Sequence, residues 1–539
     1  MPITVRPLPS LLPNDPKSHH IGNPPTGFRN PWPSFTETHH GLLSVLKVRF
    51  AKDRPAFVPV PSDRSELAPV HKIDFAALQS ASDPVFMKVT WIGHASFLIQ
   101  TTCPSPAPTI PTTSPRTPTL PPPPTPTTTT VSPAPSPAPS NSNRLPPSGQ
   151  SRTRGINILC DPVFSDRTSP ISWLGPKRYT PPPCSLSELL DHIEIDVVLI
   201  SHNHYDHADA ATLKTIWARR KQNVRFIAGL HNARWLVSAC GIDRECIIEL
   251  DWWDRVEIEV DFDIDINQPP AASASAEPGQ RQEATAAVGG VQSETSPSNP
   301  GKGNETATTS PEAIPRTQPK TDNNTTPSSM EARNSNLDSA RARARVQITC
   351  TPTQHFSSRS VFDRNHDLWC SYAIEDCSTS LPSGQHRGPK IYFAGDTAYR
   401  TVGVTTTISS EAKDEVKDRD RDQTPACPAF KQIGNLLGPF DLALLPIGLC
   451  QPREFMSNVH ADAWDSVQIH KDVRARKSIG MHWGTVRGGL SAQYEDVRDP
   501  PRHWRRAAEE AGLTWGRDVA LMDVGETVLV RGERKEGDG

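Results

Sequence analysis

The run Ser201-His-Asn-His-Tyr-Asp-His207 directly follows the apolar stretch Ile195-Asp-Val-Val-Leu-Ile200 and decides how the chain is interpreted. It places four metal-capable side chains at the end of an expected buried strand: His202, His204, Asp206 and His207. Imidazoles and carboxylates are the usual ligands of zinc and related ions. The first two histidines can point the same way because strand side chains alternate, and a turn can bring the other two back. The run offers more ligands than one open tetrahedral site needs, so it favours two adjacent metal ions.

Three later side chains also come directly after apolar runs. They are His355 after the expected strand 346–350, Asp396 after 390–394, and His482 after 477–481. Taken singly, each is more often a hydrogen-bonded histidine or a turn-capping aspartate. A binuclear site, however, needs additional ligands and a bridging carboxylate. Beside the first cluster we therefore interpret all three as candidate ligands.

Short apolar runs alternate with helical patterns along the rest of the chain. Strands are expected at 87–92, 96–100, 156–160, 195–200, 224–228, 246–250, 255–260, 346–350, 369–374, 390–394, 442–446, 477–481 and 527–530. Helices are expected at 208–220, 231–240, 461–471 and 501–511. Many strands with interspersed helices predict two sheets with helices outside, rather than one doubly wound parallel sheet.

Long polar segments interrupt this pattern. The chain has 539 residues and 56 prolines, and its polar residues cluster near 102–154, 264–343, 377–388 and 402–428. Such segments bury too little apolar surface to offset chain entropy, so we predict disordered insertions. Roughly 350 residues remain, which suits one large domain or two small ones. We expect a partly ordered N-terminal extension over 1–86 and an interrupted domain over 87–535.

Charge and targeting signals restrict the partners and the compartment. A formal net charge of −3 argues against bulk attraction to nucleic acid. The ten cysteines form no C-x-x-C pair, which favours a reducing compartment over a disulfide framework. Neither a secretory signal nor an apolar stretch long enough to span a bilayer is evident in the sequence. The expected location is intracellular, either cytoplasmic or peripheral on an organelle membrane.

The motifs together resemble a known family. H-x-H-x-D-H at 202–207 is the first motif of the metallo-β-lactamase superfamily. Within that superfamily the chain resembles the N-acylphosphatidylethanolamine-hydrolysing phospholipases D. The shared stretches, which avoid the insertions, are Asn30–Ser34, Trp91–Ser96, Asp161–Ser165, Gly175–Arg178, Ser201–His207, Asp251–Trp253, Thr351–His355, Ala394–Thr397, Leu445–Gly448, Pro452–Arg453 and His482–Thr485. The resemblance implies an α/β (α+β) fold, a four-layer αββα sandwich.

The resemblance also implies a ligand set for two Zn²⁺ ions. One zinc would be held by His202, His204 and His355, and the other by Asp206, His207 and His482. Asp396 would bridge the two ions. None of these positions departs from the family pattern, so the insertions put loop-borne substrate selectivity in doubt but not the metal centre.

The implied activity is that of a phospholipase D-type phosphodiesterase with N-acylphosphatidylethanolamine as substrate. Metal-bound hydroxide would attack phosphorus, releasing an N-acylethanolamine and phosphatidic acid. The catalytic candidates are Asp206, Asp396 and His460. Asp206 could accept the water proton, while His460 matches a family histidine near the substrate and could protonate the leaving group. An ordinary surface histidine at a helix start is an equally weighted interpretation of His460. The family also implies a homodimer.

Two segments combine basic and apolar residues and are candidates for contact with a membrane surface, Gly41–Phe50 and Ile171–Tyr179. The alternative for each is ordinary packing on the domain. Trp252, Trp253 and Trp483 are candidates for lining an acyl groove, although buried aromatic residues more often fill a core.

Two other functions remain open from the sequence. A hydrolase of the same fold could act on a soluble ester, lactone or sugar phosphate with the same metals. A non-catalytic scaffold could use the polar insertions as partner-binding arms, although a complete ligand set argues against it.

Overall fold

The computed structural model describes residues 2–36, 57–80, 86–104, 154–170, 173–263, 341–360, 362–378, 388–402 and 424–532. Most of the four expected insertions, and the candidate membrane segment at 41–50, lie outside these residues. The described residues form two large sheets and two short strand pairs.

The first large sheet has seven strands and is mixed. Its order is β10 (Ile247–Leu250), β9 (Arg225–Gly229), β8 (Val197–Ile200), β6 (Asn157–Cys160), β5 (Ser96–Gln100), β4 (Phe86–Gly93) and β19 (Thr527–Arg531). The strands from β10 to β6 pair in parallel, whereas β5, β4 and β19 pair antiparallel. The central strand β8 is buried along its whole length, as its continuous apolar run predicts.

The second large sheet has eight strands. Its order is β1 (Ile3–Leu8), β11 (Arg255–Asp263), β12 (Arg341–Thr351), β13 (Ser371–Asp376), β14 (Lys390–Phe393), β15 (Leu442–Pro446), β16 (Ser478–Met481) and β18 (Val519–Ala520). The short pairs are β17 (Val486–Arg487) with β7 (Lys177–Arg178), and β2 (His20–Ile21) with β3 (Gly27–Phe28).

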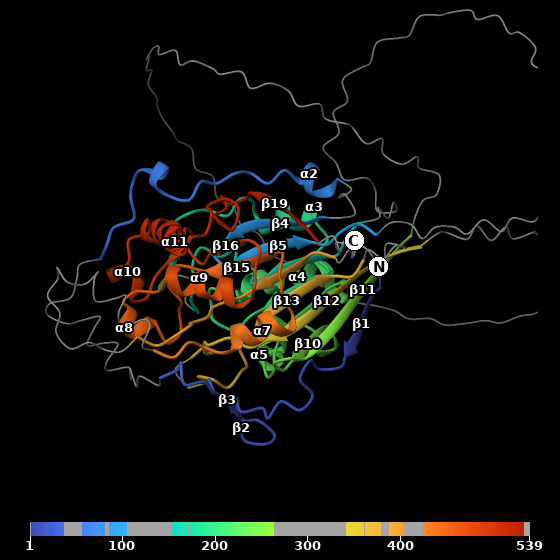
Figure 1. Ribbon diagram of the computed structural model, residues 1–539. Helices are drawn as coiled ribbons and strands as arrows, with labels where there is room; N and C mark the ends of the chain where they lie inside the picture. The colour runs from blue at the N-terminus through green and yellow to red at the C-terminus, as the bar shows by residue number, and fades with distance from the viewer. Residues whose placement is uncertain are drawn as a thin grey trace, which may run out of the picture. The chain divides into compact units, whose positions relative to one another are not determined.

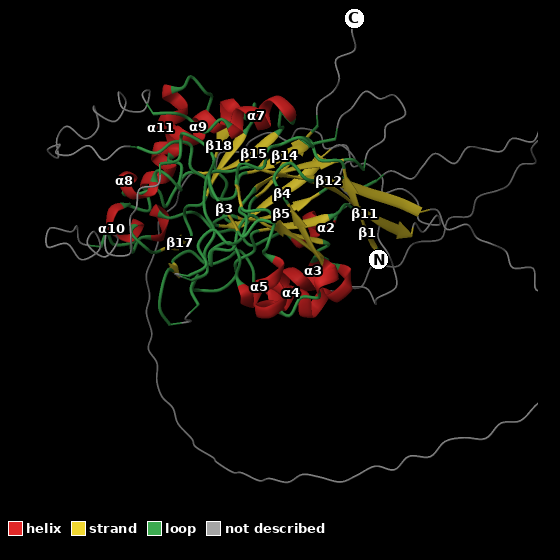
Figure 2. Ribbon diagram, turned by 90° about the horizontal axis from the view of Figure 1, so that it is seen from below, coloured by secondary structure: helices red, strands yellow, loops and turns green. Residues whose placement is uncertain are grey.

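Helices cover the outer face of each sheet. Beside the seven-stranded sheet lie α3 (Leu186–His192), α4 (Ala210–Arg220) and α5 (Ala233–Cys240), and beside the other sheet lie α7 (Ala429–Leu436), α9 (Ala463–Asp472) and α11 (Asp499–Glu510) (Figure 2). Three shorter helices are α2 (Phe75–Gln79), α8 (Arg453–Met456) and α10 (Ser491–Tyr494) (Figure 1). The layer order is helix, sheet, sheet, helix, which confirms the predicted αββα sandwich.

Two apolar cores hold the layers together. The larger lies between the sheets and continues under the second helical layer, where Trp504 of α11 is fully buried. The smaller joins the first sheet to its helices through side chains such as Leu213 and Ile216 of α4. At roughly 1.5–3 kcal/mol for each fully buried large apolar side chain, these cores supply the main stabilisation of the sandwich.

Several predicted boundaries move in the structure. Residues 341–343, assigned to the insertion at 264–343, are the start of β12, which pairs with β11. The strand expected at 369–374 begins two residues later, as β13. The N-terminal segment supplies β1, which pairs with β11 at the edge of the eight-stranded sheet. Neither β1 nor α3 was expected.

Candidate metal centre

The seven predicted ligands meet where strands of both sheets end. His202 to His207 follow β8 of the first sheet, whereas His355, Asp396 and His482 follow β12, β14 and β16 of the second. The backbone turns sharply after β14, because Gly395 has a φ of +57° and lies against Ser201. A side chain there would collide with Ser201, since a Cβ would lie 2.6 Å from its Cβ.

One half of the centre contains three histidines and a carboxylate. His202 Nε2 lies 2.8 Å from His204 Nδ1, and His355 Nε2 lies 3.2 Å from the same His204 atom. The Oδ2 atom of Asp396 is 3.9 Å from His202 Nε2 and 3.8 Å from His355 Nε2. One ligand atom from each residue lies within 4.8 Å of the others, so one metal ion could contact all four.

The other half contains Asp206, His207 and His482, again with Asp396. The Nε2 atoms of His207 and His482 are 3.3 Å apart. Asp396 Oδ1 lies 3.2 Å from the first of these nitrogens and 3.0 Å from the second. Asp206 Oδ2 lies 3.8 Å from His482 Nε2 and 3.9 Å from His207 Nε2.

Asp396 therefore faces both halves with different oxygens. Its side chain is almost fully buried, and its Oδ1 faces the ring nitrogens of His207 and His482. A buried carboxylate is costly unless positive charge compensates it. The nitrogen and oxygen donors on either side fit two divalent metal ions with Asp396 between them.

Asp161, at the end of β6, orients two histidines. Its Oδ2 atom accepts from His207 Nδ1 at 2.7 Å and from the Ser201 hydroxyl at 2.6 Å. Since the Ser201 hydroxyl donates to Asp161, it accepts from His202 Nδ1 at 2.9 Å. Both histidines thus turn their Nε2 atoms toward the centre, as outer hydrogen bonds to metal-binding histidines do.

Backbone carbonyls orient two other histidines in the same way. His355 Nδ1 donates to the carbonyl of Val459 at 2.7 Å, and His482 Nδ1 donates to that of Gly448 at 3.2 Å. A carbonyl can only accept, so a proton sits on Nδ1 of each ring and Nε2 is the nitrogen that faces inward. These contacts determine which nitrogen each ring offers.

The protonation states of the histidines differ between the two halves of the centre. Burial lowers the pKa of His204 to about 4 and that of His355 to about 3. Burial also acts against the protonation of His482, but Asp396 and Asp206 outweigh it and raise the pKa to about 9. At neutral pH the first half offers free lone pairs, while His482 carries a proton that a metal ion would displace.

His460 lies beside the centre rather than on the surface. Its Nδ1 atom is 3.8 Å from Asp396 Oδ2, and its ring centroid is 5.2 Å from that of His355 and 5.4 Å from that of His482. Burial lowers its pKa to about 3, so the ring is neutral at pH 7. A neutral imidazole still has one N–H to donate.

Two residues of the site had no individual role from the sequence. Asp161 and His94 appeared only inside longer shared motifs. His94, in the turn between β4 and β5, donates from Nε2 to Asp206 Oδ2 at 3.1 Å. Sequence spacing holds no signal for either contact, since Asp161 and His207 lie 46 residues apart and His94 and Asp206 lie 112 apart.

A third group of possible ligands has a different character. His19 and His20 approach Asp251 at 2.8 and 3.0 Å. The Lys17 ammonium lies 3.0 Å from the same carboxylate and also donates to the carbonyl of Trp252. A side-chain cation already compensates Asp251, so this cluster secures the N-terminal segment rather than extending the metal centre.

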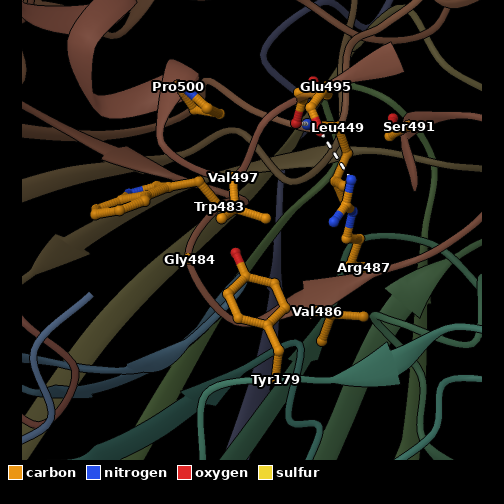
Figure 3. Close-up of a pocket in the computed structure, with 10 residues that line it drawn as sticks. All are labelled: Tyr179, Leu449, Trp483, Gly484, Val486, Arg487, Ser491, Glu495, Val497 and Pro500. Carbon is orange, nitrogen blue, oxygen red and sulfur yellow. Dashed lines mark hydrogen bonds between the residues drawn. The ribbon is translucent and has the colours of Figure 1, made fainter. Parts of the chain in front are cut away.

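Among the residues that the structure describes, the three candidate tryptophans lie in the core or beside a small pocket. Trp252 and Trp253 are buried in the larger core. Trp483 contributes to a separate small pocket, together with Tyr179, Leu449, Gly484, Val486, Arg487, Ser491, Glu495, Val497 and Pro500 (Figure 3). Its volume is about 10 Å³, enough for a single water molecule and far too small for an acyl chain.

Comparison with known proteins shows which families and relatives this chain resembles. Residues 156–295 and 423–483 match the family model described as a beta-lactamase superfamily domain. The chain is 28% identical over 374 residues to N-acyl-phosphatidylethanolamine-hydrolyzing phospholipase D 1 of Caenorhabditis elegans, covering 69% of this chain and 70% of the relative. These findings support a beta-lactamase superfamily domain over the matched stretches, in agreement with the layered fold.

Two further relatives share a lower identity with this chain. The chain is 24% identical to the Saccharomyces cerevisiae protein N-acyl-phosphatidylethanolamine-hydrolyzing phospholipase D, mitochondrial, over 67% of this chain and 49% of that one. An uncharacterized Mycobacterium tuberculosis protein is 25% identical over 62% of this chain and 55% of its own length. Among solved structures, the metallo hydrolase Igni18 of Ignicoccus hospitalis is 15% identical, covering 83% of this chain and 100% of that one, with a TM-score of 0.36.

Three of the gaps in the described chain connect neighbouring strands of the large sheets. Residues 105–153 join the end of β5 to the start of β6, and 264–340 join β11 to β12. Residues 379–387 join β13 to β14. By strand direction, the described residues that flank these three gaps lie at the sheet ends opposite the metal centre, whereas the gap at 403–423 follows β14 and Asp396.

Proposed function

We propose that this protein is a zinc-dependent phospholipase D-type phosphodiesterase that hydrolyses N-acylphosphatidylethanolamine to an N-acylethanolamine and phosphatidic acid. The observation that carries the reaction type is Asp396, whose two oxygens face two separate groups of metal-binding side chains. The lipid substrate is supported by the worm and yeast relatives, whose names state that activity.

One zinc would be held by His202, His204 and His355. The other would be held by Asp206, His207 and His482, and Asp396 would contribute to both. Bound zinc supplies a water nucleophile at neutral pH and neutralises charge on the phosphoryl oxygens. Asp206, whose side chain is 25% exposed, is the most accessible carboxylate of the centre and can accept the proton of an attacking water. The buried Asp396 stays a carboxylate, because His207 and His482 outweigh burial and hold its pKa well below the usual range.

We infer that His460 contacts the phosphate of the substrate. The Arg453 guanidinium donates to the His460 carbonyl at 2.6 Å, and the His460 amide donates to the Met456 carbonyl at 2.7 Å. Its backbone is thus fixed while its ring faces the centre. We assign its N–H to a phosphoryl oxygen or to the departing oxygen, where it stabilises charge as the bond to phosphorus breaks.

Contact with a membrane surface is part of the same proposal. In the candidate segment 171–179, the side chains of Trp173 and Leu174 are 73% and 54% exposed, and Lys177 is exposed beside them. An exposed tryptophan next to a basic residue suits the boundary of an anionic bilayer. No helix among the described residues is long and apolar enough to cross a bilayer.

The test is a product assay in H₂¹⁸O with purified, zinc-loaded protein and mixed micelles of N-acylphosphatidylethanolamine. Mass spectrometry should detect N-acylethanolamine, together with phosphatidic acid that carries the ¹⁸O, because water attacks phosphorus. A matched Trp173→Ser variant should lose activity on anionic vesicles but keep it on micelles. Turnover confined to soluble esters, lactones or sugar phosphates would contradict the lipid assignment and favour the alternative hydrolase.

A further inference from the structure

His94 lies in a tightly constrained turn between β4 and β5. Its φ is +54°, a left-handed conformation that is uncommon for residues other than glycine. The His94 carbonyl accepts from the His482 amide at 3.2 Å and from Trp91 Nε1 at 3.0 Å. The turn is therefore fastened to the loop that carries one of the candidate ligands. Strained backbone of this kind often marks functional sites, so the role of the ring is of interest.

The ring of His94 is fully buried and points at Asp206. Its Nε2 atom donates to Asp206 Oδ2 at 3.1 Å, and its centroid lies 4.1 Å from that of His482. Its other nitrogen, Nδ1, has no hydrogen-bond partner among the described residues. Among the described residues, nothing accepts a hydrogen bond from Nδ1. The ring proton therefore belongs on Nε2, which donates a hydrogen bond to Asp206.

Asp206 is the candidate ligand that most needs such a contact. Its side chain is 25% exposed, whereas those of His207, His482 and Asp396 are 2% exposed or less. Its other described neighbours in the centre, His482 and His207, are 3.8 and 3.9 Å away, beyond hydrogen-bond distance. A partly exposed carboxylate on a turn has several accessible rotamers, and one hydrogen bond restricts them.

We propose that His94 is a positioning residue that holds the Asp206 carboxylate toward His207 and His482, and thereby sets the affinity of that half of the centre for a divalent metal. The other half does not touch His94. Replacement of His94 is therefore expected to weaken the binding of only one of the two metal ions. This inference rests on the metal centre of the proposed function but not on its lipid substrate.

The test compares His94→Gln with His94→Asn. A glutamine amide can reach the position of Nε2 and donate to Asp206, whereas the asparagine amide is one methylene shorter and cannot. Full-length protein is stripped with chelator, and Zn²⁺ binding is measured by competition with a chromophoric chelator, without lipid. His94→Asn should weaken one zinc equivalent by about 10–100-fold, the usual cost of losing an outer hydrogen bond, and His94→Gln should stay within a few-fold of wild type.

His470→Asn is the matched control. His470 is also buried and hydrogen-bonded, to Ser478 Oγ at 2.8 Å, but it lies on α9 and not at the metal centre. It should leave both zinc affinities unchanged, whatever it does to thermal stability. A double variant with Asp206→Asn adds a second check, because His94→Asn should cost little more once the carboxylate is gone.

Three outcomes overturn the proposal for His94, and a fourth bears only on the substrate. Unchanged zinc binding in His94→Asn would show that Asp206 needs no positioning. Equal loss in both variants would make His94 itself a ligand, since an amide nitrogen does not replace imidazole on zinc. Failure of both variants to fold would show that the ring serves the turn rather than Asp206. Failure of the lipid assay with normal zinc binding would count against the proposed substrate alone.

Discussion

Replacement of Asp396 by asparagine tests the central feature of the site. The carboxylate places Oδ1 at 3.0 and 3.2 Å from two nitrogens of one half, and Oδ2 at 3.8 and 3.9 Å from two nitrogens of the other. Asparagine keeps the shape but removes the charge and turns one oxygen into an amide group that donates. Only one half can then receive an oxygen ligand, so the zinc content should fall from two ions per chain to at most one.

The expected loss of activity follows from this geometry. Losing one preorganised group at a charged transition state costs about 10²–10³-fold, or roughly 2.7–4 kcal/mol. Loss of a metal ion adds to that figure, so kcat on N-acylphosphatidylethanolamine micelles should fall by at least about 10³-fold. Zinc content is measured by elemental analysis and product by mass spectrometry.

Asp376→Asn is the control for this experiment. Asp376 is as buried as Asp396, but it lies at the opposite end of its sheet, where it accepts from the Thr102 amide at 2.7 Å. Its replacement should leave zinc content intact. If Asp396→Asn retained two zinc ions and more than about a tenth of the activity, the assignment of a bridging carboxylate would be refuted.

Three further predictions concern pH, orientation and backbone strain. Despite burial, carboxylates raise the pKa of His482 from 6.5 to about 9, so its stabilising contribution is present below about pH 6.5 and lost as the pH rises through about 9. Metal-free protein should therefore melt at a lower temperature at pH 9.5 than at pH 6.5, and a higher melting temperature would contradict the shift. Asp161→Asn should weaken zinc binding by about 10–100-fold in calorimetry, because Asp161 accepts from His207 Nδ1 at 2.7 Å; unchanged affinity would exclude that role. Gly395→Ala should cost roughly 1–3 kcal/mol in urea unfolding, because its Cβ would lie 2.6 Å from that of Ser201; an unchanged midpoint would argue against the tight turn.

The sequence predicts the elements whose local and global signals agree. The apolar run before Ser201 became β8, and the helix expected at 208–220 is α4, which begins after Asp209 because its side chain accepts from the Ala211 amide at 3.1 Å. Helix α3 was missed although Ser185 caps it and Glu188 stands at the third position, a recognisable start signal. Strand β1 was missed because of Pro7, which an edge strand tolerates.

The residues of the candidate site also divide into those that the sequence predicts and those that it does not. Each candidate ligand could be predicted because it follows an apolar run, and strand ends converge in this fold. The partners that orient these ligands could not, because the contacts of Asp161 and His94 depend on how distant turns pack. The interpretation of His460 as a surface residue was wrong because the segment before α9 folds back onto the centre.

The placement of the gaps has a practical consequence. The described ends of β5, β11 and β13 lie away from every catalytic candidate, so the chain leaves and re-enters the sandwich there at the sheet ends opposite the candidate metal centre. An engineer could replace residues 105–153, 264–340 and 379–387 with short linkers, or graft a reporter there, and the candidate metal centre is expected to stay intact. Such a compact derivative would suit crystallisation and inhibitor screening.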